Sequence, residues 1–143
     1  MNKELNVQVS TLIKASKADV WDALVNPETI KKYMFGTKVV SNWKKGGKII
    51  WNGVWNGKPY QDHGVILDVE PEKLLRYSHY SPLSGLPDNP LNYHTLIYEL
   101  SDSDDSQVLV SLSQDNNEGK KDAEHSKIMW QKMLEDLKEL LEK

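Results

Sequence analysis

The C-terminal segment, residues 120–143, limits the possible folds of this chain more than any other part of the sequence. Its apolar residues recur at helical spacing and form one stripe: Trp130, Met133, Leu134, Leu137, Leu140 and Leu141. Such a helix is about 36 Å long at 1.5 Å per residue. Because a helix of this kind draws most of its stability from packing its apolar face, the rest of the chain must supply a matching surface.

The segment before it is expected to supply that surface as a sheet. Apolar and polar residues alternate there with period two, and Asn56-Gly57 is the strongest two-residue hairpin signal known. We count roughly seven expected strands, at residues 5–13, 37–43, 48–55, 58–69, 74–80, 92–100 and 107–114. The predicted fold class is α+β, with a curved antiparallel sheet wrapped on the long C-terminal helix.

Two short helices are expected after the first strand. Ser16 caps the first, with Asp19 in the capping-box position, and Asn26-Pro27 begins the second as N-cap and first helical residue. The turn at residues 114–117 is expected to cap the long helix through an asparagine side chain.

Composition excludes several classes of protein. The 143 residues suit one domain, 1–143, and contain no cysteine and no apolar run near the roughly 18 residues of a membrane span. The N-terminus lacks the apolar core of a secretion signal. A net charge of −3 with both signs interspersed argues against nucleic-acid binding. We therefore expect a cytoplasmic protein without membrane insertion.

Hairpin register predicts which side chains share a face. The Asn-Gly turn places Trp51 opposite Asp62, and the loop 70–73 pairs Val69 with Leu74. The more aromatic face, which we assign to the helix, collects Ile49, Trp51, Trp55, Tyr60, Asp62, Ile66, Leu75, Tyr77 and His79. The same alternation turns inward Leu96, Tyr98, Leu100, Val108, Val110, Leu112 and Gln114.

Two members of that face are not typical of a core. Asp62 would be an inward carboxylate, and His79 lies diagonally opposite at about 7 Å. Burying an unpaired charge costs several kcal/mol, so either a gap beneath the helix holds water or a ligand, or Asp62 is solvated at the rim. The pair could act as a base and its orienting acid, or as a polar patch that orients a ligand.

A ligand site is expected between the helix and this face. Trp130 and Met133 would lie above the sheet aromatics and suit an irregular apolar guest, although ordinary core packing is the alternative. Tryptophan and tyrosine, five and six residues against one phenylalanine, carry polar groups that suit a partly wet cavity. The candidate ligand-binding residues are Trp51, Trp55, Tyr60, Asp62, Ile66, Tyr77, His79, Tyr98, Gln114, Trp130, Met133 and Leu134. The proline-rich loop 81–90 is either a lid over the cavity or a rigid crossover.

Other chemistry finds no support in the residues. Of the four histidines, His63 is expected on the outer face and His125 near the start of the long helix, so they do not converge on a metal. The acidic turn 101–106 lacks the glycine and the closing glutamate of an EF-hand. Gly46-Gly47 lacks the Lys-Ser/Thr of a phosphate loop. No cofactor, metal or catalytic residue is assigned.

The hairpin pattern Trp51-x-Gly53-x-Trp55-x-Gly57-x-x-Tyr60-x-Asp62-x-Gly64 resembles a known family. Further matching segments are Val20-Trp21-x-Ala23-Leu24, Gly46-Gly47, Ser81-Pro82-Leu83-Ser84-Gly85, Asn92-Tyr93-His94, Gln114-Asp115-Asn116-Asn117, and Trp130 with Leu137-Lys138. Together they are similar to the AHSA-type branch of the START-like (SRPBCC) superfamily, named for the C-terminal domain of the activator of the heat-shock protein 90 ATPase.

This resemblance implies a helix-grip fold with the long helix lying across the sheet over a hydrophobic cavity. It implies binding of a small hydrophobic or amphipathic molecule, because relatives in the superfamily bind lipids, hormones or polyketides. It also leaves open a stress-related, co-chaperone-like interaction with a heat-shock protein 90 homologue, and a cavity enzyme of cyclase or hydrolase type.

Overall fold

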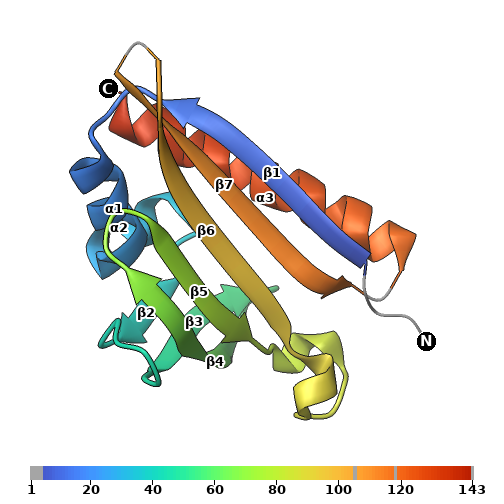
Figure 1. Cartoon of the computed structure of the whole chain (residues 1–143). Helices are drawn as coiled ribbons and strands as arrows, with labels where there is room; N and C mark the ends of the chain where they lie inside the picture. The colour runs from blue at the N-terminus through green and yellow to red at the C-terminus, as the bar shows by residue number, and fades with distance from the viewer. Residues whose placement is uncertain (1–4, 105, 118, 143) are drawn as a thin grey trace.

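The computed structural model describes residues 5–104, 106–117 and 119–142, except the side chains of Leu5 and Trp55 (Figure 1). The elements follow in the order β1 (Leu5–Ile13), α1 (Lys17–Val25), α2 (Pro27–Tyr33), β2 (Lys38–Ser41), β3 (Lys48–Trp55), β4 (Lys58–Glu70), β5 (Leu74–His79), the 3-10 turns η1 (Pro82–Ser84) and η2 (Pro90–Asn92), β6 (His94–Ser103), β7 (Gln107–Asn117) and α3 (Lys120–Leu141). None of the helices in these ranges has an apolar stretch of the kind that a bilayer crossing needs.

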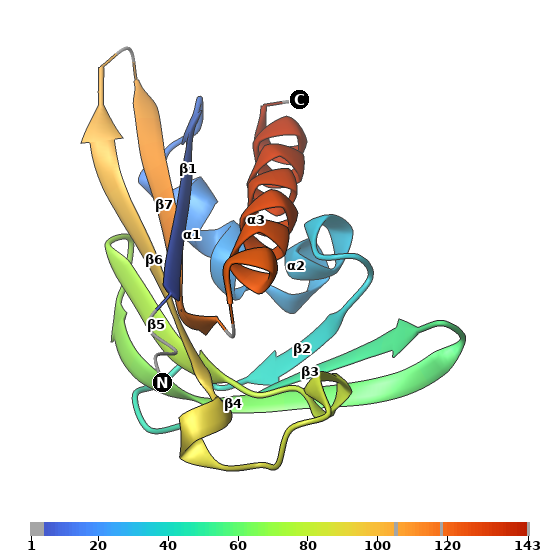
Figure 2. The ribbon, with the colours of Figure 1, turned by 90° about the vertical axis from the view of Figure 1, so that its right-hand side faces the viewer.

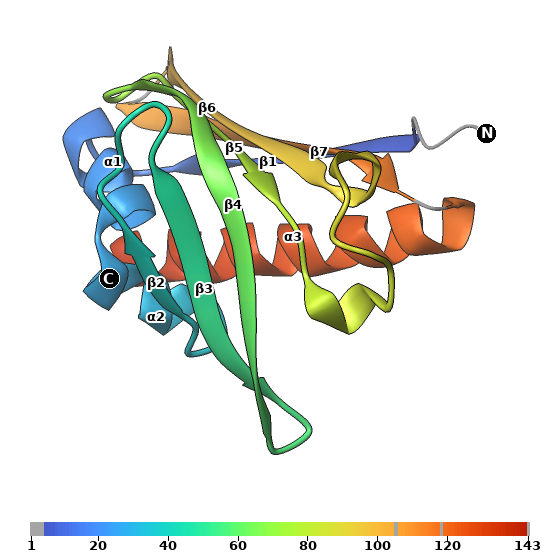
Figure 3. The same cartoon turned by 90° about the horizontal axis from the view of Figure 1, so that it is seen from below.

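One open, curved antiparallel sheet organises the molecule. Its strand order is β1-β7-β6-β5-β4-β3-β2. Helix α3 lies on the concave side of the sheet, and α1 and α2 lie near the C-terminal end of α3 (Figures 2 and 3). The predicted helix-grip α+β fold is confirmed. On the buried stripe of α3, Met133, Leu134 and Leu137 have no exposed surface.

The helix starts follow from local sequence in two cases and not in the third. The Ser16 hydroxyl accepts a hydrogen bond from the Asp19 amide at 3.1 Å, and Asn26 caps α2 through the Glu28 amide at 3.1 Å, as predicted. The asparagine cap predicted for α3 is wrong, because β7 runs on to Asn117 and the helix begins after Gly119 without a side-chain cap.

The first hairpin has the predicted register, with Trp51 opposite Asp62. In the second, the predicted pairing of Val69 with Leu74 is wrong, because Glu70 pairs with Leu74 and the turn is one residue shorter. A bulge between Ile66 and Asp68 restores the predicted pairing of Ile66 with Tyr77. The predicted inward face of β4 and β5 is therefore correct beyond the bulge.

Candidate ligand-binding site

The two polar residues predicted on the inner face meet there. The His79 imidazole Nε2 lies 2.8 Å from Asp62 Oδ2, and Asp62 is only 8% exposed, so it is not solvated at the rim. Gly64 allows β4 and β5 to approach at this point, since a Cβ atom on it would lie 1.7 Å from the Ser78 carbonyl oxygen. The absence of a side chain at Gly64 thus permits the close strand approach at which Asp62 and His79 meet.

This pair leaves two buried atoms without hydrogen bonds. Among the described residues, neither Asp62 Oδ1 nor His79 Nδ1 has a partner. In the neutral tautomer whose Nε2–H donates a hydrogen bond to the carboxylate, Nδ1 is an acceptor. Asp62 Oδ1 and His79 Nδ1 then both require a hydrogen-bond donor. An unsatisfied buried polar atom costs about 1–3 kcal/mol, and such atoms typically mark a bound water, a ligand or a catalytic role.

Aromatic rings extend from the pair into the sheet hollow. Trp51 meets the His79 ring edge-on at 4.8 Å between centroids and lies 5.1 Å from the Tyr77 ring. The Tyr77 hydroxyl donates to that of Tyr98 at 3.4 Å. Burial raises the pKa of Tyr77 well above its usual value and that of Tyr98 to about 12, so both hydroxyls remain protonated at neutral pH.

The space around these aromatics is nearly filled. The cavity that Trp51, Tyr77 and Tyr98 line with residues of α1, α2 and β2 measures about 10 Å³, the least that holds one water. Ile66, Met133 and Leu134, which we predicted to contact a ligand, are fully buried in the core. The unfilled space predicted beneath the middle of the helix is thus not observed, because these side chains reach into the hollow of the sheet.

Open space lies at the N-terminal end of α3. A cavity of about 290 Å³, here called the end cavity, is lined by residues of the sheet, of the β5–β6 loop (residues 81–93) and of the first turns of α3. Figure 3 shows the β5–β6 loop beside the N-terminal part of α3. His79, His94 and Asn117 contribute from the sheet, Leu86 from the loop, and Ser126 from α3. Of the predicted ligand-binding residues whose side chains the structure describes, only His79 lines it.

His94 is a site residue that the sequence analysis missed. Its ring stacks on that of His79 at 6.3 Å and 26°, and its Nδ1 donates to the Asp115 carbonyl at 2.9 Å. The sequence pattern indicates this position, because His94 lies two residues before the inward Leu96 and therefore faces the same way. In the strand pairing it lies opposite His79. Within the described ranges, no group of three or more histidine, aspartate or glutamate side chains is arranged so that it could hold a metal ion.

The other predicted ligand-binding residues that the structure describes are absent from the lining of the end cavity. The Trp130 indole donates to the Gln114 side-chain oxygen at 3.2 Å and so links α3 to β7. Tyr60 covers Gly53 near the tip of the β3–β4 hairpin, where a Cβ atom on the glycine would lie 2.5 Å from the ring. The side chain of Trp55 lies outside the described part of the chain.

Sequence comparison establishes the family. Residues 14–142 match the family described as activator of Hsp90 ATPase homolog 1-like protein. The chain belongs to this family. A comparison with curated proteins gave no match.

Solved structures of this family and fold agree with the assignment. ChR145 from Cytophaga hutchinsonii is 51% identical, with a TM-score of 0.87 over 99% of this chain and 97% of that one. The Aha1 dimer from Colwellia psychrerythraea is 20% identical, with a TM-score of 0.75 over 96% of both chains. CalU16 from Micromonospora echinospora is 18% identical, with a TM-score of 0.73 over 95% of this chain and 75% of that one. The last two likenesses show the fold alone.

Proposed function

We propose that this AHSA1-family chain binds a small amphipathic molecule in the end cavity. The observation that carries the proposal is the His79–Asp62 pair: His79 lines the end cavity, and Asp62 Oδ1 and His79 Nδ1 are buried without a hydrogen-bond partner among the described residues. A ligand hydroxyl or amine, or a water held by the ligand, would satisfy an acceptor that the protein leaves unpaired. Both acceptors are closed to solvent in this conformation, so contact requires a small displacement of the surrounding side chains.

The size and lining of the end cavity fit such a ligand. Its 290 Å³ lies at the lower end of the roughly 300–1,000 Å³ typical of ligand pockets. Leu86 supplies an apolar wall, whereas His94, Asn117 and Ser126 supply polar groups. Trp51 is the first ring behind His79, so deeper entry of an apolar group would disturb its packing.

The test is a titration that reports on both tryptophan fluorescence and amide resonances. The probes are the amphipathic dye 1-anilinonaphthalene-8-sulfonate (ANS), a medium-chain fatty acid and a hydroxylated aromatic polyketide. We expect at least one probe to shift the amide resonances around His79 and His94. Resonances unchanged by the whole panel would contradict the proposal.

A matched pair of variants locates the site. Ser126→Phe places a ring in the end cavity, whereas Lys127→Phe places the same ring on the neighbouring exposed position of α3. We expect the first variant to abolish probe binding and the second to retain it, with both still folded by circular dichroism. Equal binding by the two variants would place the ligand elsewhere.

The description of the family supports a second candidate function. Its reference member activates the Hsp90 ATPase, and the same fold here leaves an exposed outer sheet face and helix α3 available to a protein partner. We propose as the alternative that the chain contacts a heat-shock protein 90 homologue. A measurement of that homologue's ATP turnover with and without the chain decides it, and no change in turnover would reject it.

A further inference from the structure

The β5–β6 loop separates the end cavity from the outer face of the sheet. Ser84, Leu86 and Asn92 on its inner side line the cavity. Between the two 3-10 turns the loop pairs with no strand, and most of its side chains are exposed, including Leu91 at 75%. A segment with so little buried surface opens at low free-energy cost.

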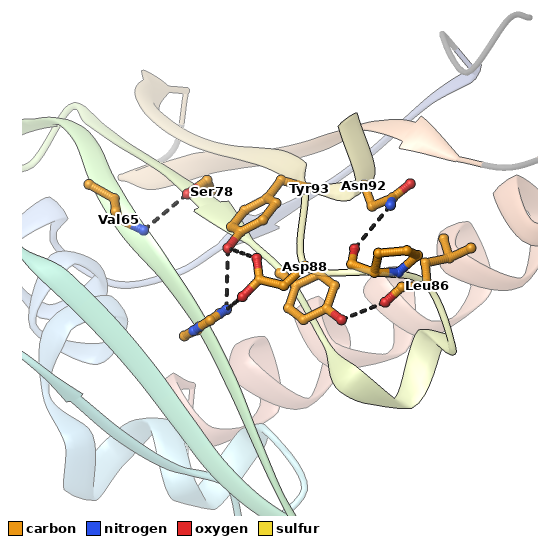
Figure 4. Close-up of polar contacts among 9 residues, drawn as sticks. Val65, Ser78, Leu86, Asp88, Asn92 and Tyr93 are labelled. Atoms are coloured by element: carbon orange, nitrogen blue, oxygen red, sulfur yellow. Dashed lines mark hydrogen bonds and ion pairs between the residues drawn. The ribbon is translucent and has the colours of Figure 1, made fainter. Parts of the chain in front are cut away.

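Three side chains, here called the latch, hold the middle of this loop to the outer face of β4. The Tyr93 hydroxyl donates to Asp88 Oδ1 at 2.5 Å, and His63 Nε2 lies 3.1 Å from Asp88 Oδ2 and 3.2 Å from the Tyr93 oxygen (Figure 4). Both carboxylate oxygens of Asp88 are thereby engaged. Bonds to a charged group are stronger than neutral ones, but the His63 and Asp88 side chains are 44% and 50% exposed, so water competes for them.

Ring stacking positions the latch. The Tyr93 ring stacks at 5.3 Å on Tyr80 and at 6.0 Å on His63, and the Tyr80 hydroxyl donates to the Leu86 carbonyl at 2.5 Å. Tyr80 itself is buried and bridges to β4 through two backbone hydrogen bonds with His63. The start of the loop is therefore fixed to the sheet.

The end of the loop is fixed as well. The Asn116 side-chain amide donates to the carbonyls of Leu91 and Tyr93 at 2.9 Å each. Asn116 has φ +60° in the bulge where β7 pairs with β1, a left-handed conformation that asparagine tolerates better than most residues. Between the two fixed ends, the described contacts of the loop middle include those of Asp88 and the hydrogen bond from the Asn92 side-chain amide to the Pro87 carbonyl at 3.0 Å. The contacts of Asp88 join the loop middle to β4, and they can break while the ends hold.

We propose that the β5–β6 loop is a gate to the end cavity and that Asp88 is its catch. When Asp88 leaves Tyr93 and His63, the segment between η1 and η2 moves outward, the hydrogen bond from Tyr80 to the Leu86 carbonyl opens with it, and the wall formed by Leu86 is removed. A ligand enters or leaves in that state. This inference rests on the proposed function, because it assigns the route to the same cavity.

Kinetics distinguishes a gate from a ligand contact. A gate changes association and dissociation rates by the same factor and leaves Kd unchanged, whereas loss of a ligand contact mainly raises the dissociation rate. The variants are Asp88→Asn and Tyr93→Phe, which remove the charge or the hydroxyl and keep the shape. The control is Asp104→Asn, the same change in the exposed β6–β7 turn.

Stopped-flow fluorescence with ANS measures both rates. For the two latch variants we expect the association rate and the dissociation rate to rise about tenfold each. This is about the effect of losing one charge-assisted hydrogen bond. The control should have the rates of wild type. NMR relaxation dispersion on the free variants should show increased microsecond-to-millisecond exchange in residues 82–92 and not in β6 or β7.

Three results would overturn the gate. Rates equal to wild type, or a raised dissociation rate with unchanged association, would contradict it while leaving ligand binding intact. Absence of increased exchange in residues 82–92 of the free variants would contradict the latch itself. If that exchange increases but no variant binds ANS or the other probes, the latch stands and the proposed function fails, and with it the gate.

Discussion

The two halves of α3 meet the same sheet in different ways. In the C-terminal half, Met133, Leu134 and Leu137 are fully buried against it, and the cavity among the nearby aromatics holds about one water. The N-terminal half borders the end cavity, and Ile128 on its outer side is 71% exposed. One amphipathic helix therefore packs against the sheet at one end and borders a cavity at the other.

The largest expected effect tests the packed half. Leu134→Ala should lower the free energy of unfolding by about 3–5 kcal/mol, because a fully buried leucine loses its contacts and leaves a cavity. The control is Leu86→Ala, which removes the same atoms from the wall of the end cavity and should cost less than about 1 kcal/mol, since half-buried positions lose little transfer energy. Urea denaturation measures both. Equal decreases in the free energy of unfolding for the two variants would show that the two halves of α3 are packed equally well.

The second prediction concerns the boundary between the halves, at the His79–Asp62 pair. His79→Ala should destabilise the fold by about 3 kcal/mol, because the partner carboxylate stays buried and unpaired. The double variant Asp62→Leu, His79→Phe should recover most of that loss, since replacing a buried polar pair by apolar residues of similar volume is often neutral for stability. It should also lose probe binding in the titration above.

A failure of the double variant to recover would be informative. It would mean that the pair stabilises the fold by itself, and the two unpaired acceptors would then not indicate a ligand. Thermal and urea denaturation of the single and double variants under identical conditions decide between these explanations.

Most of the fold followed from local rules in the sequence. Alternation and the Asn-Gly turn were enough to place Trp51, Asp62, Tyr77 and His79 on one face, and the caps at Ser16 and Asn26 set the first two helices. The turn after β4 was one residue shorter than expected, and the bulge in β4 compensated for it. Register beyond that point was predicted correctly only because these two differences cancel.

Local sequence rules could not predict how side chains fill the space between α3 and the sheet, or which contacts hold the β5–β6 loop. Whether Met133 and Leu134 fill the hollow depends on the curvature of the sheet and on side-chain rotamers, which alternation does not contain. The contact between His63 and Asp88 joins an outward strand position to an irregular loop, so no periodic pattern specifies it. His94, in contrast, was predictable from its ladder position opposite His79.

The third prediction uses the tyrosines of the packed half. Burial raises the pKa of Tyr98 to about 12, against 10.0 unperturbed, so the stabilising protonated form is fully present below pH 10 and its contribution is lost as pH rises toward 12. That loss amounts to about 3 kcal/mol. Tyr98→Phe should show a smaller decrease in stability between pH 9 and pH 11.5 than wild type, measured by urea denaturation.

The smallest expected effect concerns the latch beside the open half, and it leaves global stability nearly unchanged. The hydrogen bond to Asp88, more than burial, raises the pKa of Tyr93 from 10.0 to about 12. In Asp88→Asn the neighbouring charge is gone, so the pKa of Tyr93 should fall toward 10. In an ultraviolet titration at 295 nm, one tyrosine should then ionise at lower pH than in wild type. The same titration of Tyr93→Phe identifies that tyrosine as Tyr93. The buried Tyr77 and Tyr98 should titrate as before, because Asp88 does not contribute to their shifts. A titration curve identical to wild type would show that Asp88 does not hold Tyr93 in solution, and the loop would then depend on its other contacts, among them those of Asn116, the Tyr80–Leu86 hydrogen bond and ring stacking.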